Sequence, residues 1–305
     1  MTNFDYLKLG ASLYVPATRN DIAAIANNAK LPGLRSVIFC LEDSILDRDL
    51  DSALANLDAA LQVMTPQDGK LRFIRVRNPE VLAQCLHLSH IYKIDGFVLP
   101  KTTLSSFKAY QAVLPEASPF KLMPTLETRE ALDMAEMVAL RTYIIEQGLA
   151  PQILSLRIGG NDLLNLYGLR RSSARTIYDS PLRTVISQLV SCFRPYGFNL
   201  TAPVCELLYE RDILNSEVSL DLDHGLFGKT AVHPDQLAII EEHFRVSAAH
   251  VEAANEILDK DAPAVFQRDN AMCEPATHRN WAEAILARAR IYGVHGERQR
   301  LVRVG

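Results

Sequence analysis

The stretch Ser36-Val-Ile-Phe-Cys-Leu-Glu-Asp-Ser44 places two carboxylates directly after a short apolar run. The apolar run, residues 37–41, is too short for a helix and is typical of a strand buried on both faces of a parallel sheet. Glu42 and Asp43 then follow at the carboxyl end of this strand, where parallel α/β proteins carry their active sites. The pair is therefore a candidate for catalysis, and capping of the next helix by Asp43 or Ser44 is the structural alternative.

Strand-like and helix-like segments alternate along the whole chain. Eight strands are predicted, at residues 9–15, 36–41, 71–76, 94–99, 121–126, 153–158, 199–205 and 225–232. The clearest intervening helices are predicted at residues 21–30, 50–64, 130–147 and from 235 to about 244. Eight strand–helix pairs in succession predict an α/β fold of the (β/α)8 TIM-barrel type. We expect a barrel domain over residues 1–245 and a helical C-terminal extension over 246–305, with helices near 248–258 and 281–292.

Composition and charge limit the classes of function. The chain has 305 residues, 48% hydrophobic and 22% charged, which is typical of a soluble globular protein. Its net charge of -4 gives no basic footprint for nucleic acid. Its five cysteines include no CxxC pair, which predicts free thiols in a reducing cytoplasm. We expect neither a secretory signal nor a membrane span, because the opening residues 1–5 carry no basic region and no long apolar core follows.

Charged residues follow most of the predicted strands. They are Glu42, Asp43, Arg75, Arg77, Lys101, Glu127, Asp162 and Glu206. Taken singly, each can be a solvated residue at a strand end. Because the carboxyl ends of barrel strands converge on one mouth, the set predicts an active site there.

Seven motifs occur in a fixed order between about residues 10 and 245. They are Ser-Leu-Tyr-Val-Pro-Ala-Thr-Arg (12–19), Leu-Glu-Asp-Ser (41–44), Ile-Arg-Val (74–76), Leu-Pro-Lys (99–101), Leu-Glu-Thr (126–128), Gly-Asn-Asp-Leu (160–163) and Gly-Lys-Thr-Ala-Val-His-Pro-Asp-Gln (228–236). This series resembles that of the citrate lyase beta subunit and its relatives, the CitE-like carbon–carbon bond lyases of the HpcH/HpaI aldolase superfamily. The resemblance implies a TIM barrel, a divalent metal, usually Mg²⁺, and cleavage or formation of a bond next to a carbonyl through an enolate. It also implies a small carboxylate substrate such as oxaloacetate or pyruvate, or a CoA thioester, and assembly as a homotrimer or hexamer.

Glu127 and Asp162 are the predicted Mg²⁺ ligands, because they end adjacent strands and stand where the resemblance places the metal carboxylates. Mg²⁺ prefers oxygen ligands and keeps several waters, so two protein carboxylates are enough. Glu42 and Asp43 would then act through metal-bound water or in catalysis. The eight histidines show no ligand spacing for zinc, and His233 is expected to support the loop after the eighth strand.

Arg75 is predicted to be catalytic. When a bond beta to a carbonyl breaks, negative charge accumulates on the carbonyl oxygen, where a guanidinium and a metal stabilise it. Arg77 would share a strand face with Arg75, and it stands where the family usually has asparagine. We expect Arg19 and Lys101, together with these two arginines, to bind carboxylate or phosphate groups of the substrate, although Lys101 can instead pair with a neighbouring acid.

Further departures from the family motifs indicate a divergent branch with its own substrate. They are Asp47-Arg48-Asp49 in place of a lysine, the segment 202–206 at strand seven, and an arginine-rich ending over 279–303. The general acid or base stays open among Glu42, Asp43 and Glu206. Two functions besides a Mg²⁺-dependent lyase also stay open. One is an aldolase that acts on free 2-oxo acids without CoA, and the second is a metal-binding barrel without catalysis that serves as a partner protein.

Overall fold

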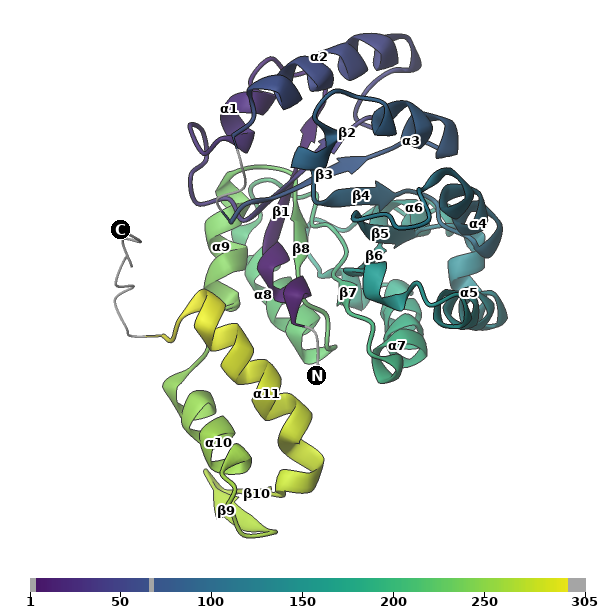
Figure 1. The fold of residues 1–305 in the computed structure, drawn as a ribbon. Helices are drawn as coiled ribbons and strands as arrows, with labels where there is room; N and C mark the ends of the chain where they lie inside the picture. The colour runs from purple at the N-terminus through teal and green to yellow at the C-terminus, as the bar shows by residue number, and fades with distance from the viewer. Residues whose placement is uncertain (1–3, 66–68, 296–305) are drawn as a thin grey trace.

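The computed structural model describes residues 4–65 and 69–295, and in these ranges eight parallel strands form a ring (Figure 1). The strands are β1 (Ala11–Pro16), β2 (Ser36–Cys40), β3 (Leu71–Arg75), β4 (Gly96–Leu99), β5 (Lys121–Leu126), β6 (Leu156–Ile158), β7 (Leu200–Thr201) and β8 (Lys229–Ala231). They are ordered β7-β6-β5-β4-β3-β2-β1-β8, and each neighbouring pair is parallel. The predicted TIM barrel is therefore confirmed, and all carboxyl ends lie at one rim.

The ring is closed between β7 and β8, which are two and three residues long. Ala202, just past β7, forms a parallel bridge with Lys229, and its N–H donates to the Gly228 carbonyl at 2.9 Å. Both strands are shorter than the predicted ranges 199–205 and 225–232. Pro203 has no N–H with which to extend the pairing of β7, and Gly228 has a φ of +89°, which is not an extended conformation.

The barrel interior is built in layers. Leu9, Ile38, Phe73, Val98 and Met123 are fully buried and fill its amino-terminal half. Side chains two residues further along a strand point in the same direction, one layer nearer the carboxyl rim. On β2, β3 and β5 this alternation brings Cys40, Arg75 and Thr125 into the mouth.

The barrel helices follow their strands in the predicted alternation. They are α1 (Ile22–Ala26), α2 (Leu50–Val63), α3 (Pro79–Leu86), α4 (Leu104–Val113), α5 (Met134–Glu146), α6 (Gly160–Leu166), α7 (Leu182–Phe193), α8 (Arg211–Asp223) and α9 (Asp235–His243). The predicted helix 21–30 ends early, because Asn28 and Leu31 have positive φ. The predicted helix 130–147 starts only at Met134, where the Asp133 carboxylate accepts a hydrogen bond from the Ala135 N–H and caps it.

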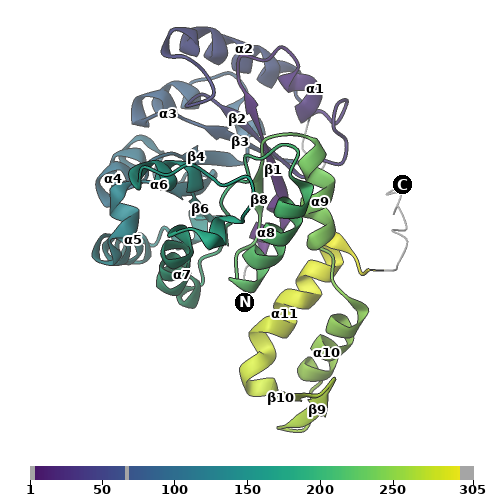
Figure 2. The ribbon, with the colours of Figure 1, turned by 180° about the vertical axis from the view of Figure 1, so that it is seen from behind.

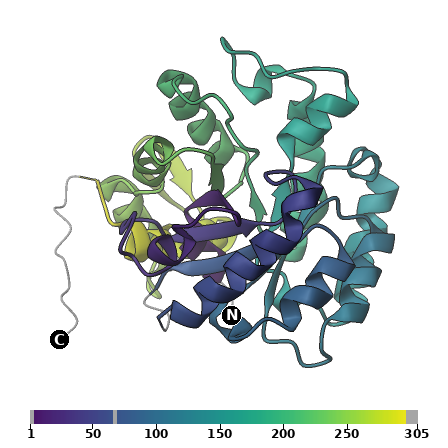
Figure 3. The same ribbon diagram turned by 90° about the horizontal axis from the view of Figure 1, so that it is seen from above.

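A helical extension follows the barrel, as predicted (Figures 1 and 2). It consists of α10 (Ala248–Leu258), a hairpin of β9 (Phe266–Arg268) and β10 (Ala271–Cys273), and α11 (Pro275–Tyr292). The hairpin was not predicted; it turns at Asp269-Asn270, which both have positive φ, as tight hairpin turns require. Seen from above, much of the yellow α11 is covered by the barrel (Figure 3). The division at residue 245 stays a prediction.

The end of α11 is anchored to the amino-terminal side of the barrel. The Tyr292 hydroxyl donates to the Leu7 carbonyl, and its ring packs against Phe244 with centroids 5.5 Å apart. Arg35, which precedes β2, donates to the Ile291 carbonyl at 3.0 Å. The five cysteines are free, as predicted, and all five are buried. None of the helices within residues 4–65 and 69–295 is long and apolar enough to cross a membrane.

Candidate active site

A cavity of about 470 Å³ lies at the carboxyl rim of the barrel. It brings together five of the predicted residues from four different strand ends: Glu42, Asp43, Arg75, Glu127 and Asp162. The cavity also offers buried polar atoms that have no hydrogen-bond partner, namely Arg75 Nε, Thr125 Oγ1 and Thr201 Oγ1. Buried polar groups are normally paired, so these atoms are available to a ligand.

Arg75 lies at the centre of the carboxylates. Its Nη2 is 2.7 Å from Glu42 Oε2, 3.2 Å from Glu127 Oε1 and 3.6 Å from Asp43 Oδ2. Burial lowers the pKa of Arg75. Tyr14, Glu127 and Glu42 together raise it by more than burial lowers it, so the pKa lies above its ordinary value. The guanidinium therefore stays charged in a site that is largely screened from water.

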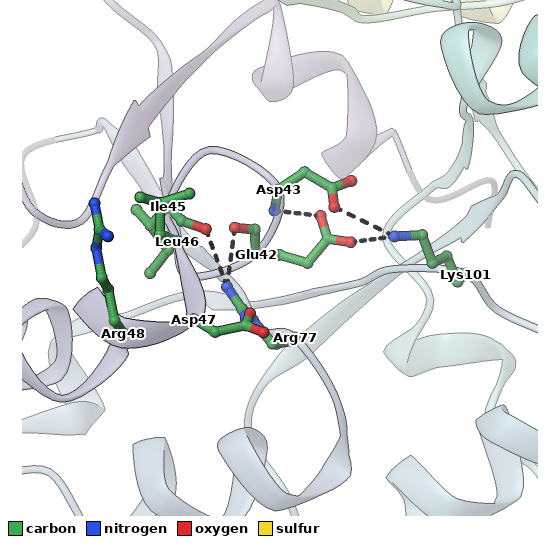
Figure 4. Close-up of a pocket in the computed structure, with 8 residues that line it drawn as sticks. All are labelled: Glu42, Asp43, Ile45, Leu46, Asp47, Arg48, Arg77 and Lys101. Carbon is green, nitrogen blue, oxygen red and sulfur yellow. Dashed lines mark hydrogen bonds and ion pairs between the residues drawn. The ribbon is translucent and has the colours of Figure 1, made fainter.

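Lys101 joins the same group through both its backbone and its side chain. Its N–H donates to Glu127 Oε1 at 2.8 Å, while its Nζ donates to Glu42 Oε1 at 2.8 Å and to Asp43 Oδ1 at 3.3 Å (Figure 4). A φ of +47° aims the N–H into the site, a left-handed conformation that is uncommon for a residue with a side chain. Lys101 thus pairs with neighbouring acids, one of the two roles that its sequence position allowed.

Glu127 is a buried carboxylate on the floor of the cavity, 3% exposed. Burial raises its pKa to about 7; the charge of Arg75 opposes this rise and that of Asp162 adds to it. Both hydrogen bonds of Glu127 use Oε1, and its Oε2 lies against Gly159. A Cβ added at Gly159 would lie 2.3 Å from Oε2, so only glycine fits beside this carboxylate.

Asp162 lies in the first turn of α6, immediately after β6. The Gly159 N–H donates to the Leu126 carbonyl at 3.1 Å, which ties the start of α6 to the strand end that carries Glu127. Within residues 4–65 and 69–295 there is no group of three or more His, Cys, Asp or Glu side chains that could hold a metal. Glu127 and Asp162 both line the cavity, and two carboxylates suit a cation that completes its shell with water and substrate oxygens, as Mg²⁺ does.

Arg157 on β6 was missed from the sequence. It is 3% exposed and lines the same cavity, where its guanidinium lies 5.6 Å from the Tyr14 ring centroid and donates to the Thr230 hydroxyl. Arg75 lies 5.7 Å from the centroid of that ring. The sequence feature that could have identified it is a single charged residue in the largely apolar segment 153–158. The alternation of side chains along a strand directs this residue into the barrel.

Arg77 does not share the face of Arg75, because β3 ends at Arg75. Its guanidinium donates to the carbonyls of Leu41, Glu42 and Ile45 at 3.2–3.3 Å, as partly drawn in Figure 4. It also pairs with Asp47. Arg77 and Lys101 line a second cavity of about 620 Å³ beside the mouth, which shares Glu42 and Asp43 with the first.

Three more residues that the sequence singled out, Arg19, Glu206 and His233, lie outside this group. Arg19 is half-exposed and donates to both oxygens of Asp21, at 2.7 and 2.8 Å, and it lines neither cavity. The Glu206 carboxylate accepts a hydrogen bond from Asn161 at the start of α6. His233 is 45% exposed and lies 3.6 Å from Asp235. The substrate-binding roles of Arg19, Arg77 and Lys101 stay predictions.

Comparisons with known proteins agree with the barrel fold. A family model described as a carbon–carbon bond lyase of the TIM-barrel fold matches residues 3–294. Curated relatives include (3S)-malyl-CoA thioesterases of two Cereibacter sphaeroides strains, which are 25% and 26% identical over 80% of this chain and 79% of their own length. CitE from Mycobacterium tuberculosis, solved with magnesium, acetoacetate and coenzyme A, is 20% identical over 93% of this chain and 100% of its own, with a TM-score of 0.67. RipC from Yersinia pestis is 20% identical over 80% of this chain and 99% of its own, with a TM-score of 0.59.

Proposed function

Since the chain belongs to the family of carbon–carbon bond lyases of the TIM-barrel fold, we propose that it is a Mg²⁺-dependent enzyme that breaks or makes a carbon–carbon bond next to a carbonyl through an enolate. This membership also confirms the resemblance to the CitE-like lyases that the motifs indicated. The observation that carries the proposal is the meeting of Arg75, Glu127 and Asp162 in one cavity at the carboxyl rim.

The proposed substrate is a small carboxylate, either free or as its CoA thioester. The curated relatives are named for malyl-CoA, and the CitE structure holds acetoacetate and coenzyme A. A cavity with two arginines, Arg75 and Arg157, suits a substrate that carries a carboxylate. The oxygen-lined side of the same cavity, with Glu127 and Asp162, would hold Mg²⁺, which as a Lewis acid polarises a carbonyl oxygen.

Arg75 is proposed to stabilise the oxyanion that develops when the bond breaks. Three carboxylates hold the Arg75 guanidinium in place, and its Nε is buried without a partner. The Nε–H donor therefore needs no rearrangement to bind a substrate oxygen. Preorganised donors of this kind typically contribute a factor of about 10² to 10³ in rate.

Asp43 is the acid–base group that the contacts favour over Glu42. Glu42 is buried, and both of its oxygens are engaged, Oε1 by Lys101 and Oε2 by Arg75. The Asp43 side chain is 60% exposed and lines the cavity. Burial raises the pKa of Asp43, but its contacts with Glu42 and Lys101 lower it below the ordinary value, so the carboxylate is ionised at neutral pH. We propose that Glu42 and Lys101 hold Asp43 while it exchanges a proton with the substrate.

Product analysis of the purified protein tests this proposal. With Mg²⁺, malyl-CoA and citryl-CoA would be supplied in turn, and the formation of a shorter acyl-CoA plus a 2-oxo acid would be followed by chromatography. We expect cleavage that stops when EDTA is added and that is lost in Asp162→Ala. The matched control is Lys8→Ala, which removes an exposed ion pair with Asp5 far from the rim and should retain activity. Cleavage that persists in EDTA would contradict the proposal.

Thioester hydrolysis is a second candidate, because the curated relatives are named thioesterases. The same assay separates the two, since hydrolysis of malyl-CoA yields malate and free CoA without a carbon–carbon cleavage product. Condensation of free 2-oxo acids without CoA would instead indicate an aldolase. Cation binding without turnover of any of these compounds would indicate a non-catalytic partner protein. Assembly as a homotrimer or hexamer and a cytoplasmic location stay predictions.

A further inference from the structure

A cluster of buried charges lies outside the ring of strands, between β8 and α8, which run beside each other in Figures 1 and 2. It contains Lys229 from β8, Glu217 and Asp221 from α8, and Arg171 and Tyr178 from the segment between α6 and α7. The four charged side chains are at most 3% exposed. Because two positive and two negative side chains meet there, the cluster is balanced in charge.

Each charged group of the cluster makes hydrogen bonds, and Arg171 Nε is a buried donor without a partner. Lys229 Nζ donates to Glu217 Oε1 at 2.9 Å and to Asp221 Oδ2 at 2.8 Å. Arg171 pairs with Glu217 Oε2, and the Tyr178 hydroxyl donates to Asp221 at 2.6 Å. Replacing such a buried network with apolar residues is often neutral or stabilising, so stability alone does not account for it. Its directional contacts can instead fix the geometry of the segments that it holds.

The cluster holds two loop segments at the carboxyl rim. After β7, the Pro203 carbonyl accepts a hydrogen bond from Lys229 Nζ at 2.8 Å, and the Val204 carbonyl accepts one from Arg171 at 3.1 Å. Before α7, the Ile177 N–H donates to Glu217 Oε2 at 3.0 Å. Glu217 therefore links both segments.

Pro203 and Ile177 meet at Gly160, the first residue of α6. A Cβ added at Gly160 would lie 2.9 Å from Pro203 Cβ and 2.9 Å from Ile177 Cδ1, so both side chains pack directly on its backbone. On the other side, Gly159 lies against Glu127. The start of α6 is thus held between the buried carboxylate and the two anchored segments, and Asp162 stands two residues further on.

We propose that Lys229, Glu217 and Asp221 are positioning residues that set Asp162 for cation binding, by holding Pro203 and Ile177 against the start of α6. The inference rests on the proposed function, because it takes Asp162 as a ligand of the divalent cation. It assigns a role to Lys229, which does not line the cavity and whose Nζ donates to Pro203, Glu217 and Asp221.

Mn²⁺ binding measures this effect without any turnover. Free Mn²⁺ would be followed by electron paramagnetic resonance during titration of the full-length protein, well below the unfolding temperature. Loss of groups that orient metal ligands commonly weakens affinity about 10-fold to 100-fold, and we expect about 10-fold for Glu217→Gln. Gly160→Ala leaves the cluster intact but forces Pro203 and Ile177 away from α6, so it should weaken binding in the same direction.

Glu241→Gln is the matched control. Like Glu217, Glu241 is a carboxylate paired with an arginine, Arg35 at 2.8 Å, but it is only partly buried and accepts the Ala11 N–H at the opposite rim of the barrel. It should lower stability and leave Mn²⁺ affinity unchanged. A folded Glu217→Gln variant that binds Mn²⁺ as tightly as the wild type would overturn the inference. If that variant does not fold, unchanged affinity in Gly160→Ala would overturn it instead.

A further pair of measurements separates this inference from the proposed function. If the wild type binds no Mn²⁺, or if Asp162→Ala does not weaken binding, the proposed cation site is wrong and the inference falls with it. If the wild type and Asp162→Ala behave as proposed while Glu217→Gln binds normally, the inference alone is wrong.

Discussion

At the scale of single residues, the buried carboxylate of Glu127, which lies against Gly159, makes the site sensitive to pH. Its pKa is raised from 4.5 to about 7 in the folded protein. A raised folded-state pKa stabilises the fold below the unfolded value, and this contribution is lost as the pH rises through the folded value. In the cation-free protein, the wild type should therefore lose up to about 3 kcal/mol of unfolding free energy relative to Glu127→Gln between pH 4.5 and pH 8. Urea denaturation in EDTA across this range measures the difference, and a difference that does not vary with pH would contradict it.

Arg75 can be tested with its charge retained. In Arg75→Lys the positive charge that balances Glu42 and Glu127 remains, but the planar set of donors is lost. We expect kcat to fall about 10²-fold to 10³-fold, the usual cost of one oxyanion donor, while Mn²⁺ affinity changes only a few-fold. Steady-state kinetics and Mn²⁺ titration of the same preparation check both statements. Normal turnover in this variant, or in Arg75→Ala, would exclude the role.

The grouping of the acids with Arg75 was predictable, because each follows an apolar run that ends at the same rim. The direction of Arg77 was not, since it depends on β3 ending two residues earlier. Arg157 was missed because one charge inside a short apolar run looks like an interruption of the core. Arg19 turns to Asp21, a contact between residues two apart whose geometry the sequence does not give.

At the scale of elements, Arg77 holds the segment 41–47 that carries Glu42 and Asp43. Its guanidinium reaches three backbone carbonyls, and Lys or Met cannot reproduce this set of donors. Arg77→Met should lower the unfolding free energy by about 1–3 kcal/mol and speed proteolysis of this segment. Asp47→Ala is the control, because Asp47 is 95% exposed and should change stability by less than about 0.5 kcal/mol. Equal effects in the two variants would show that the ion pair, and not the carbonyl contacts, stabilises the segment.

The strands with the clearest sequence signal, β2 to β5, were located to within two residues at either end. Their side chains are buried on both faces, so their apolar runs are continuous. β7 and β8 were overestimated, because pairing there is limited by Pro203 and Gly228 and not by side-chain character. The hairpin β9–β10 was missed because its strands are three residues each and only one of the six residues is buried.

At the scale of the whole molecule, Tyr292 joins the C-terminal extension to the barrel. Its ring is 2% exposed and its hydroxyl is bonded to Leu7. Tyr292→Ala should cost about 3–5 kcal/mol of unfolding free energy, and Tyr292→Phe about 1 kcal/mol, because only the hydrogen bond is lost. Tyr209→Ala, at an 85% exposed position, should be close to neutral. Thermal denaturation measures the series, and a Tyr292→Ala variant as stable as the wild type would show that the extension contributes little to the barrel.

The overall architecture was predictable because eight repeats of strand and helix admit few arrangements. The packing of α11 back onto the first residues of the described chain was not, because it depends on contacts between residues some 285 positions apart.

The seam between β7 and β8 is short: it consists of the bridge between Ala202 and Lys229 and of backbone hydrogen bonds from Ala202 to Gly228 and from Phe227 to Leu200. Backbone amides on either side of it should exchange with deuterated solvent sooner than those of β1 to β4, which are paired along their whole length. Transient opening at this seam would loosen the wall of the barrel next to the candidate cavity. The same motion that opens the ring would then also admit a ligand.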